Sequence, residues 1–214
     1  MPLAFNFRNG VAALLLGLAV SASLYLWLAL MNAVPLDIAV PLSLGHIQTP
    51  EFTTKVTIPY DIDIAFDSTK IPYEKLNCLI GMNLDSVQPC TDEPSILNVK
   101  WKVVSDGQTL ANGSSTDTVR AGYSYHKTAR YMGRFDAKSG KKYRLEIDVL
   151  QDATQLALAN PRLGIEPFLN AYDGRLLLAG PAFYVGLFGA AIGIITMVTS
   201  TIREMRLRKT LARS

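Results

Sequence analysis

Charge is missing from two long stretches of this 214-residue sequence. The 28 residues between Arg8 and Asp37 include no Asp, Glu, Lys or Arg, and neither do the 27 residues between Arg175 and Arg203. A helix needs about 20 apolar residues to cross a bilayer. The two stretches therefore exclude a protein that is soluble throughout, and they predict transmembrane helices at residues 11–34 and 176–199.

The first stretch has an alternative interpretation as a signal peptide. Val20-Ser21-Ala22 resembles the small-residue site at which such a peptide is cleaved. The apolar run resumes after that site, from Leu24 to Met31, which a mature secreted N-terminus does not require. We therefore expect an uncleaved span, with cleavage as the alternative.

Basic residues beside the two stretches predict the orientation. Arg8 precedes the first, while five Lys or Arg and one Glu follow the second. Because the cytoplasmic flanks of membrane helices are enriched in Lys and Arg, we expect both termini in the cytoplasm. The domains are then a cytoplasmic N-terminus (1–10), a first span (11–34), a periplasmic domain (35–175), a second span (176–199) and a basic cytoplasmic tail (200–214), all held in the inner membrane.

Ionisable side chains are absent from both spans, which argues against a transporter or a proton path. Small residues recur there four positions apart, and such stripes let helix backbones approach closely in lipid. The stripes would pair the two spans with each other or with a partner's spans, unless they only reflect how common Gly and Ala are in membrane helices. The candidate helix-packing residues are Gly17 and Ser21 in the first span and Gly186, Gly189, Ala190 and Gly193 in the second.

The segment between the spans changes to short alternating runs separated by turn residues. Apolar and polar residues alternate in 60–66, 97–103 and 143–149, which is typical of half-buried strands. Asp106-Gly107 is a hairpin turn sequence between two such runs. Six or seven strands of this kind predict a mainly β domain, an antiparallel immunoglobulin-like β-sandwich flanked by two transmembrane α-helices.

Two local features refine this prediction. Tyr143 opens an alternating strand after a turn, as tyrosine does at the corner of immunoglobulin-like sandwiches. An ordinary hairpin with a half-buried tyrosine is the alternative. Pro72 followed by apolar residues at helical spacing predicts one short helix within residues 68–82.

Cysteine occurs only twice, as Cys78 and Cys90. Both lie in the segment expected outside the cytoplasm, where disulfides persist. We therefore expect a disulfide between them, with two free thiols as the alternative. The two histidines, His46 and His126, lack a second His or Cys at ligand spacing, so no zinc site is expected.

Motifs for catalysis or cofactor binding are scarce. The run from Gly122 to His126 resembles a nucleophile elbow, but a histidine stands where the second glycine is required, so we interpret Ser124 as a loop residue. Asp61, Asp63 and Asp67 could suggest a cation site, but alternation places the first two on a solvated strand face. We expect no enzyme activity, no metal and no cofactor, unless acids distant in sequence converge in space.

One segment stands out by its charge. From Arg120 to Arg144 there are eight Lys or Arg against the single acid Asp136. Nucleic acid is excluded as a partner by the expected compartment. An acidic protein partner, anionic lipid headgroups or simple solvation remains, and interfaces favour Arg and Tyr. The candidate partner-binding residues of this basic face are Arg120, Lys127, Arg130, Arg134, Lys141, Lys142 and Arg144, together with Tyr123, Tyr125 and Tyr131.

Several motifs follow one another in a fixed order along residues 35–167. They are the entry Val34–Gly45, Phe52-x-x-x-Val56-x-Ile58-Pro59, Tyr60-x-Ile62-x-Ile64-x-Phe66, Asp106-Gly107, Arg134-Phe135…Gly140-x-x-Tyr143-Arg144-Leu145-x-Ile147 and Pro161-Arg162-Leu163-x-Ile165. This order resembles a family of bacterial extracytoplasmic immunoglobulin-like β-sandwich domains of unknown function. Its members are often lipoproteins encoded near interbacterial toxin genes, and some are suspected immunity factors. The chain departs from the family by lacking a lipobox cysteine and by adding a second span.

Together these observations predict a membrane-anchored periplasmic binding protein that acts by protein–protein interaction. The resemblance implies an immunity protein that neutralises an interbacterial toxin. The alternative is an accessory or structural subunit of an inner-membrane complex, held by the small residues of its spans. An envelope hydrolase is the disfavoured third interpretation. The expected partners are an acidic protein and membrane lipids.

Overall fold

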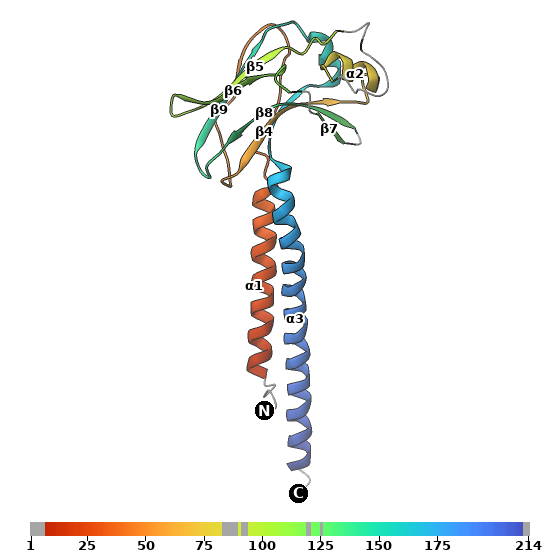
Figure 1. Ribbon diagram of the computed structural model, residues 1–214. Helices are drawn as coiled ribbons and strands as arrows, with labels where there is room; N and C mark the ends of the chain where they lie inside the picture. The colour runs from red at the N-terminus through yellow and green to blue at the C-terminus, as the bar shows by residue number, and fades with distance from the viewer. Residues whose placement is uncertain (1–6, 83–89, 91–93, 119–120, 125, 212–214) are drawn as a thin grey trace. The chain divides into compact units, whose positions relative to one another are not determined.

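The computed structural model describes residues 7–82, 90, 94–118, 121–124 and 126–211. The chain divides into two compact units, a helical unit of Met1–Leu30 with Tyr172–Ser214 and a β unit of Met31–Ala171. The elements in chain order are α1 (Phe7–Met31), β1 (Leu36–Ala39), β2 (Gly45–Gln48), β3 (Phe52–Thr53), β4 (Pro59–Asp67), α2 (Tyr73–Leu79), β5 (Val99–Ser105), β6 (Gln108–Ser114), β7 (Ala121–Ser124), β8 (Lys127–Asp136), β9 (Lys142–Val149), the 3-10 helix η1 (Thr154–Ala159), β10 (Arg162–Pro167) and α3 (Leu169–Leu211), most of them labelled in Figure 1.

The β unit is a sandwich of two antiparallel sheets. The first sheet has the strand order β1-β10-β4-β8-β7, and the second has the order β2-β9-β5-β6. The short strand β3 also pairs with β9, next to β2 along the same edge. The last strand, β10, lies between β1 and β4, and strand order varies in this way among proteins that share the sandwich architecture. The prediction of a mainly β sandwich with flanking apolar helices is confirmed.

Alternation along the strands builds the core. In β4, Ile62, Ile64 and Phe66 are at most 1% exposed, whereas Asp61 and Asp63 lie half-buried on the outward face of the first sheet. The same period of two buries every second side chain of β9. Removing these apolar side chains from water is the main force that holds the two sheets together.

Trp101 of β5 fills the space between the sheets where β8 is irregular. Its indole N–H donates a hydrogen bond to the carbonyl oxygen of Met132, with an N–O distance of 3.0 Å. The pairing of β4 with β8 shifts by one residue at this point. The ring lies so close to Gly133 and Gly113 that a Cβ on either would overlap it, so both positions require glycine.

Tyr143 forms the predicted tyrosine corner. Its hydroxyl oxygen accepts a hydrogen bond from the backbone N–H of Lys138, five residues upstream, at 2.7 Å. The ring is 2% exposed and lies 5.9 Å from Phe52 and 5.4 Å from Phe135, measured between ring centroids. The hydroxyl thus ties the turn before β9 to the strand while the ring extends the core.

The short helix α2 is confirmed, and the disulfide holds it. Cys78 in α2 is bonded to Cys90, with the two Cα atoms 5.4 Å apart. The carbonyl oxygen of Leu79 accepts hydrogen bonds from the backbone N–H groups of Ile96 and Leu97, which lead into β5. The C-terminal end of the helix is therefore fixed twice, by the disulfide and by the hydrogen bonds to Leu79.

The helical unit consists of α1 and α3, which lie side by side in opposite directions (Figure 1). Phe7–Met31 and Phe183–Thr210 are each long and apolar enough to span a membrane. The helix α3 has 43 residues, about 65 Å at 1.5 Å per residue. It therefore extends beyond the predicted span 176–199 at both ends, and its last turns include most of the predicted basic tail.

Candidate functional site

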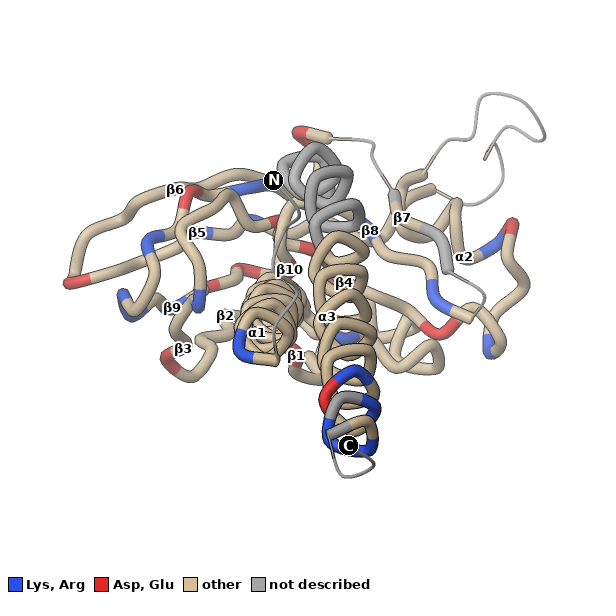
Figure 2. Tube along the Cα trace, turned by 90° about the horizontal axis from the view of Figure 1, so that it is seen from below, with Lys and Arg blue, Asp and Glu red and all other residues tan. Residues whose placement is uncertain are grey.

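The predicted basic face is divided between the two sheets. Lys127, Tyr131 and Arg134 belong to β8 in the first sheet, whereas Lys142 and Arg144 belong to β9 in the second. Figure 2 shows β8 and β9 in separate parts of the β unit. Arg120 and Tyr125 lie outside the described residues, as does the side chain of Tyr123. The described members of this set therefore do not form one continuous surface, because alternation and strand order direct them to different sides.

Arg130 lies inside the sandwich and is only 3% exposed. Its Nη2 donates hydrogen bonds to the carbonyl oxygens of Ser115, at 2.7 Å, and Thr118. Burial lowers the pKa of the guanidinium, because it disfavours the charged form. Arg130 thus holds the segment between β6 and β7 against β8, and it is not part of the exposed surface.

The side chain of Arg134 points away from the core, but it already contacts an acid and two aromatic rings. Its Nε donates a hydrogen bond to Asp61 Oδ1 at 2.7 Å. The guanidinium carbon lies 3.2 Å from the ring centroid of Phe168 and 5.9 Å from that of Tyr131, a cation–π arrangement on two aromatic rings. The backbone N–H of Phe168 donates to the carbonyl oxygen of Pro59 at 3.1 Å. Arg134 therefore helps to fix the residue that immediately precedes α3.

The cations of the second sheet have acidic neighbours. Glu51 lies 3.3 Å from Arg144 and 3.6 Å from Lys142, measured between oxygen and nitrogen. Lys141 forms an ion pair with Asp106 at 3.1 Å. These are surface ion pairs, which contribute little to stability, but they reduce the positive potential that an approaching acidic partner would meet.

The predicted helix-packing residues lie at the contact between α1 and α3. A Cβ on Gly17 would come within 2.5 Å of the backbone of Gly186 and Ala190, and a Cβ on Gly193 within 2.5 Å of the backbone nitrogen of Leu14. Ser21 faces Gly186, whereas a Cβ on Gly189 would lie 3.8 Å from Gly17, an ordinary contact. The small residues are thus used within the chain, by pairing one helix with the other.

Four acids converge on the outward face of the first sheet. Asp63 lies on β4 among Asp37 of β1, Glu166 of β10 and Asp61 of its own strand, and its carboxylate lies over Gly164, where any side chain would overlap it. Burial and these three acids raise the pKa of Asp63 to about 7, although Lys127 opposes the shift. Sequence alternation assigned Asp63 to the solvated face, but it could not reveal the three acids gathered around it.

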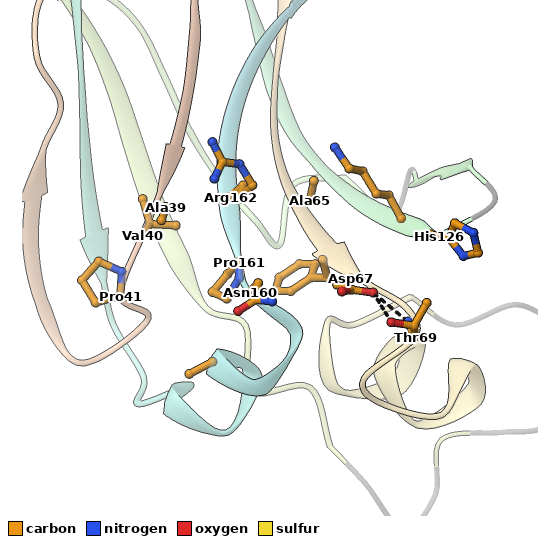
Figure 3. Close-up of a pocket in the computed structure, with 13 residues that line it drawn as sticks. Ala39, Val40, Pro41, Ala65, Asp67, Thr69, His126, Asn160, Pro161 and Arg162 are labelled. Atoms are coloured by element: carbon orange, nitrogen blue, oxygen red, sulfur yellow. Dashed lines mark hydrogen bonds between the residues drawn. The ribbon is translucent and has the colours of Figure 1, made fainter.

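A hollow of about 890 Å³ opens at one end of the first sheet. It lies at the strand ends opposite to those where the chain enters β1 and leaves β10. Sequence reasoning did not find it, because its lining comes from four segments that are far apart in the chain. The lining residues, most of them labelled in Figure 3, are Ala39, Val40, Pro41, Ala65, Phe66, Asp67, Thr69, His126, Lys127, Ala157, Asn160, Pro161 and Arg162.

Two charged side chains of the hollow are bound to neighbours. Asp67 Oδ1 accepts hydrogen bonds from the backbone N–H and the hydroxyl of Thr69, at 2.9 and 2.6 Å, shown as dashed lines in Figure 3. These bonds are the main reason that the pKa of Asp67 is lowered. Arg162 Nε donates to Asp37 Oδ1 at 2.7 Å, and its Nη2 donates to the carbonyl oxygen of Asp37 at 3.0 Å.

The two histidines lie in different parts of the sandwich, His46 in β2 and His126 in the turn between β7 and β8. His46 Nδ1 is 2.7 Å from Asp148 Oδ1 on the outward face of the second sheet, while His126 lines the hollow. Among the residues that the structure describes, no group of three His, Cys, Asp or Glu could hold a metal ion. The hollow is therefore the candidate ligand site, and the outward face of β8 is the candidate protein interface.

No family model and no curated protein matches this chain. A crystal structure of a protein from Sulfurospirillum deleyianum is similar to it, with 12% sequence identity and a TM-score of 0.44. The similarity covers 63% of this chain and 97% of that one.

Proposed function

We propose that the chain is an inner-membrane protein with two spans that holds its β-sandwich in the periplasm and acts by binding a protein partner. The observation that carries this proposal is a disulfide-bonded sandwich between two helices long and apolar enough to span a membrane. Stable disulfides are typical of oxidising compartments outside the cytoplasm. The β unit therefore belongs on that side of the membrane.

The charge at the end of α3 supports the orientation. Arg203, Arg206, Arg208 and Lys209 stand there with the single acid Glu204, and Figure 2 shows Lys and Arg gathered at that end. Basic residues that follow a span favour the cytoplasmic side. Because α1 and α3 run in opposite directions, the N-terminus is then cytoplasmic as well.

The contact between α1 and α3 favours recognition through the sandwich over assembly through the spans. Gly17 contacts Gly186 and Ala190, and Gly193 contacts Leu14. Because these contacts lie within the chain, this stripe is not available to helices of another subunit. The proposed partner is accordingly an acidic protein, in the immunity interpretation an interbacterial toxin. The four acids around Asp63 are an observation in favour of the hydrolase alternative. Two of them, Asp37 and Asp61, are however bound to arginines, so we retain protein binding as the proposed function.

The orientation is tested with fusion proteins. Alkaline phosphatase fused after Phe168 is expected to be active, because it would lie in the periplasm. Green fluorescent protein fused after Ser214 is expected to fluoresce, because it would lie in the cytoplasm. Inactive phosphatase at the first position, or a dark C-terminal fusion made in normal amounts, would contradict the proposed topology.

The binding activity is tested with the product of the neighbouring gene and the full chain in nanodiscs. We expect a 1:1 complex that weakens about tenfold in Lys127→Glu, because Lys127 is an exposed cation on the outward face of β8. The matched control is Lys100→Glu, also an exposed lysine, on β5 of the other sheet. Equal weakening by both variants would contradict recognition through β8, and a neighbouring product that never binds would contradict the immunity interpretation.

A further inference from the structure

The hollow exists because short side chains stand on an outward sheet face. Ala39, Arg162 and Ala65 are register partners across β1, β10 and β4, and all three line the hollow. Outward faces of antiparallel sheets usually carry polar side chains that reach into water. Two alanines in this row, with Ala157 of η1 beside them, leave a space of about 890 Å³, which is within the range of small-ligand pockets.

Arg162 supplies a fixed cation to this space. It stands between the two alanines, and its bonds to Asp37 hold the guanidinium in one orientation. A guanidinium has further N–H donors beyond the two used here. Figure 3 shows the Arg162 side chain between Ala39 and Ala65. An anion that entered the hollow would thus meet donors that are already positioned.

Lys127 supplies a second cation. Its register partner Asp67 is bound to Thr69 instead, and Lys127 forms no ion pair with the residues that the structure describes. The acid that Lys127 does influence is Asp63, whose pKa of about 7 means that it carries only part of a negative charge at neutral pH. The lysine therefore keeps much of its capacity to bind an external anion.

We propose that the hollow binds a small organic anion whose carboxylate or phosphate group is held by Lys127 and Arg162. Its apolar body lies on the short and apolar side chains of the lining, chiefly Ala65, Ala157 and Pro41. Charge-assisted hydrogen bonds to the head group give such a site its selectivity, and apolar burial adds affinity in proportion to the area covered. This site shares Lys127 with the protein interface proposed on β8, but Ala65 and Arg162 belong to the hollow alone. Loss of anion binding in Ala65→Leu with partner binding unchanged therefore distinguishes the two sites.

The test is calorimetric titration of the full chain in nanodiscs, with empty nanodiscs as the blank. The probes are hexanoate and hexyl phosphate, which distinguish the two head groups. We expect at least one of them to bind saturably. Neutral 1-hexanol, and the head groups alone as acetate and inorganic phosphate, should bind at least tenfold more weakly. Absence of saturable binding by both probes, or equal binding of 1-hexanol, would overturn the proposal.

Three variants locate the binding. Ala65→Leu fills the hollow and Lys127→Gln removes one cation, so each is expected to lower the affinity for the probe at least tenfold. Ala129→Leu is the control, because Ala129 is the register partner of Ala65 on β8 but does not line the hollow. Unchanged binding in Lys127→Gln, an exposed substitution that leaves the core intact, would overturn the site even if Ala65→Leu failed to fold.

Discussion

Asp63 has an unusual environment for an acid on a sheet surface. Its carboxylate is partly removed from water and has Asp61, Asp37 and Glu166 around it, with Lys127 as the opposing charge. Each of these acids disfavours a further negative charge. The folded protein therefore binds a proton at Asp63 in a pH range where the unfolded chain does not.

This difference predicts how stability depends on pH. The pKa of Asp63 rises from 3.8 in the unfolded chain to about 7 in the folded protein. The free energy of unfolding therefore falls as the pH rises from about 4 to 7, and above pH 7 the contribution of Asp63 to it no longer changes. We expect Asp63→Asn to stabilise the protein at pH 8 by roughly 2 kcal/mol, allowing for partial solvent screening, and to have little effect at pH 4. The measurement is the thermal unfolding midpoint at both pH values, and an equal effect at both would contradict the assigned cause.

Single residues differ in how well the sequence predicts them. Tyr143 could be placed because a turn, a tyrosine and an alternating strand together form a local pattern. Arg130 could not, since an arginine at an inward position of β8 contradicts the usual alternation of apolar and polar residues. Its burial depends on the carbonyl oxygens of Ser115 and Thr118, which come from a different part of the chain. A local pattern contains no information about such acceptors.

At the scale of elements, the contact between α1 and α3 depends on the absence of side chains. Gly17 allows its helix to approach the backbone of Gly186 and Ala190, whereas Gly189 faces a wider gap. In a bilayer, helices gain no hydrophobic driving force from pairing, so close van der Waals contact is their main attraction. The two glycines therefore differ in importance although both belong to the same predicted set.

A pair of matched variants tests this difference. In Gly17→Ala the new methyl group would lie 2.5 Å from backbone atoms of α3, so the helices must move apart. In Gly189→Ala the nearest atom is 3.8 Å away, and nothing needs to shift. We expect Gly17→Ala alone to lower the SDS fraction at which the two helices separate in mixed micelles. Equal sensitivity of the two variants would show that this contact does not hold the helices together.

Strands with strict alternation could be predicted, whereas the short strand β2 could not. The runs 60–66, 97–103 and 143–149 correspond to β4, β5 and β9. The edge made by β2 and β3 is broken at Pro50, which has no N–H to donate, and the Thr49 hydroxyl accepts a hydrogen bond from the Leu145 N–H at 3.0 Å instead. The length of α3 was underestimated because its basic end was interpreted as a tail, although Arg and Lys are good helix formers.

For the whole molecule, the disulfide links stability to the compartment in which the protein folds. Cys78 and Cys90 are 12 residues apart, and closing a loop of that size contributes about 3 kcal/mol in the chain-entropy model. We expect the double variant Cys78→Ser with Cys90→Ser to lose about that much free energy of unfolding. A reductant should lower the unfolding midpoint of the natural protein to that of the variant and leave the variant unchanged. A natural protein insensitive to reductant would contradict a stabilising role.

The arrangement of the whole sandwich lies beyond local sequence patterns. The hollow joins residues 39–41, 65–69, 126–127 and 157–162, and the insertion of β10 between β1 and β4 is what brings them together. Alternation predicts that these segments are strands or turns, but it does not predict which strands become neighbours. Composition and charge, by contrast, describe long stretches, so the apolar flanking helices could be predicted.

The pairing of β1 with β10 has a mechanical consequence. The chain enters the sandwich at Leu36 and leaves it near Ile165, and these two residues are register partners. If the two flanking helices were pulled apart, the load would fall on this one pair first, and the hydrogen bonds towards Ala39 would then break one after another. If both helices were held together while a partner pulled on the far end of the sandwich, the load would instead act in shear on the pairing of β10 with β4, whose hydrogen bonds would share it in parallel. A force that separates the two helices is thus expected to open the domain more easily than a force that pulls the sandwich away from both helices together.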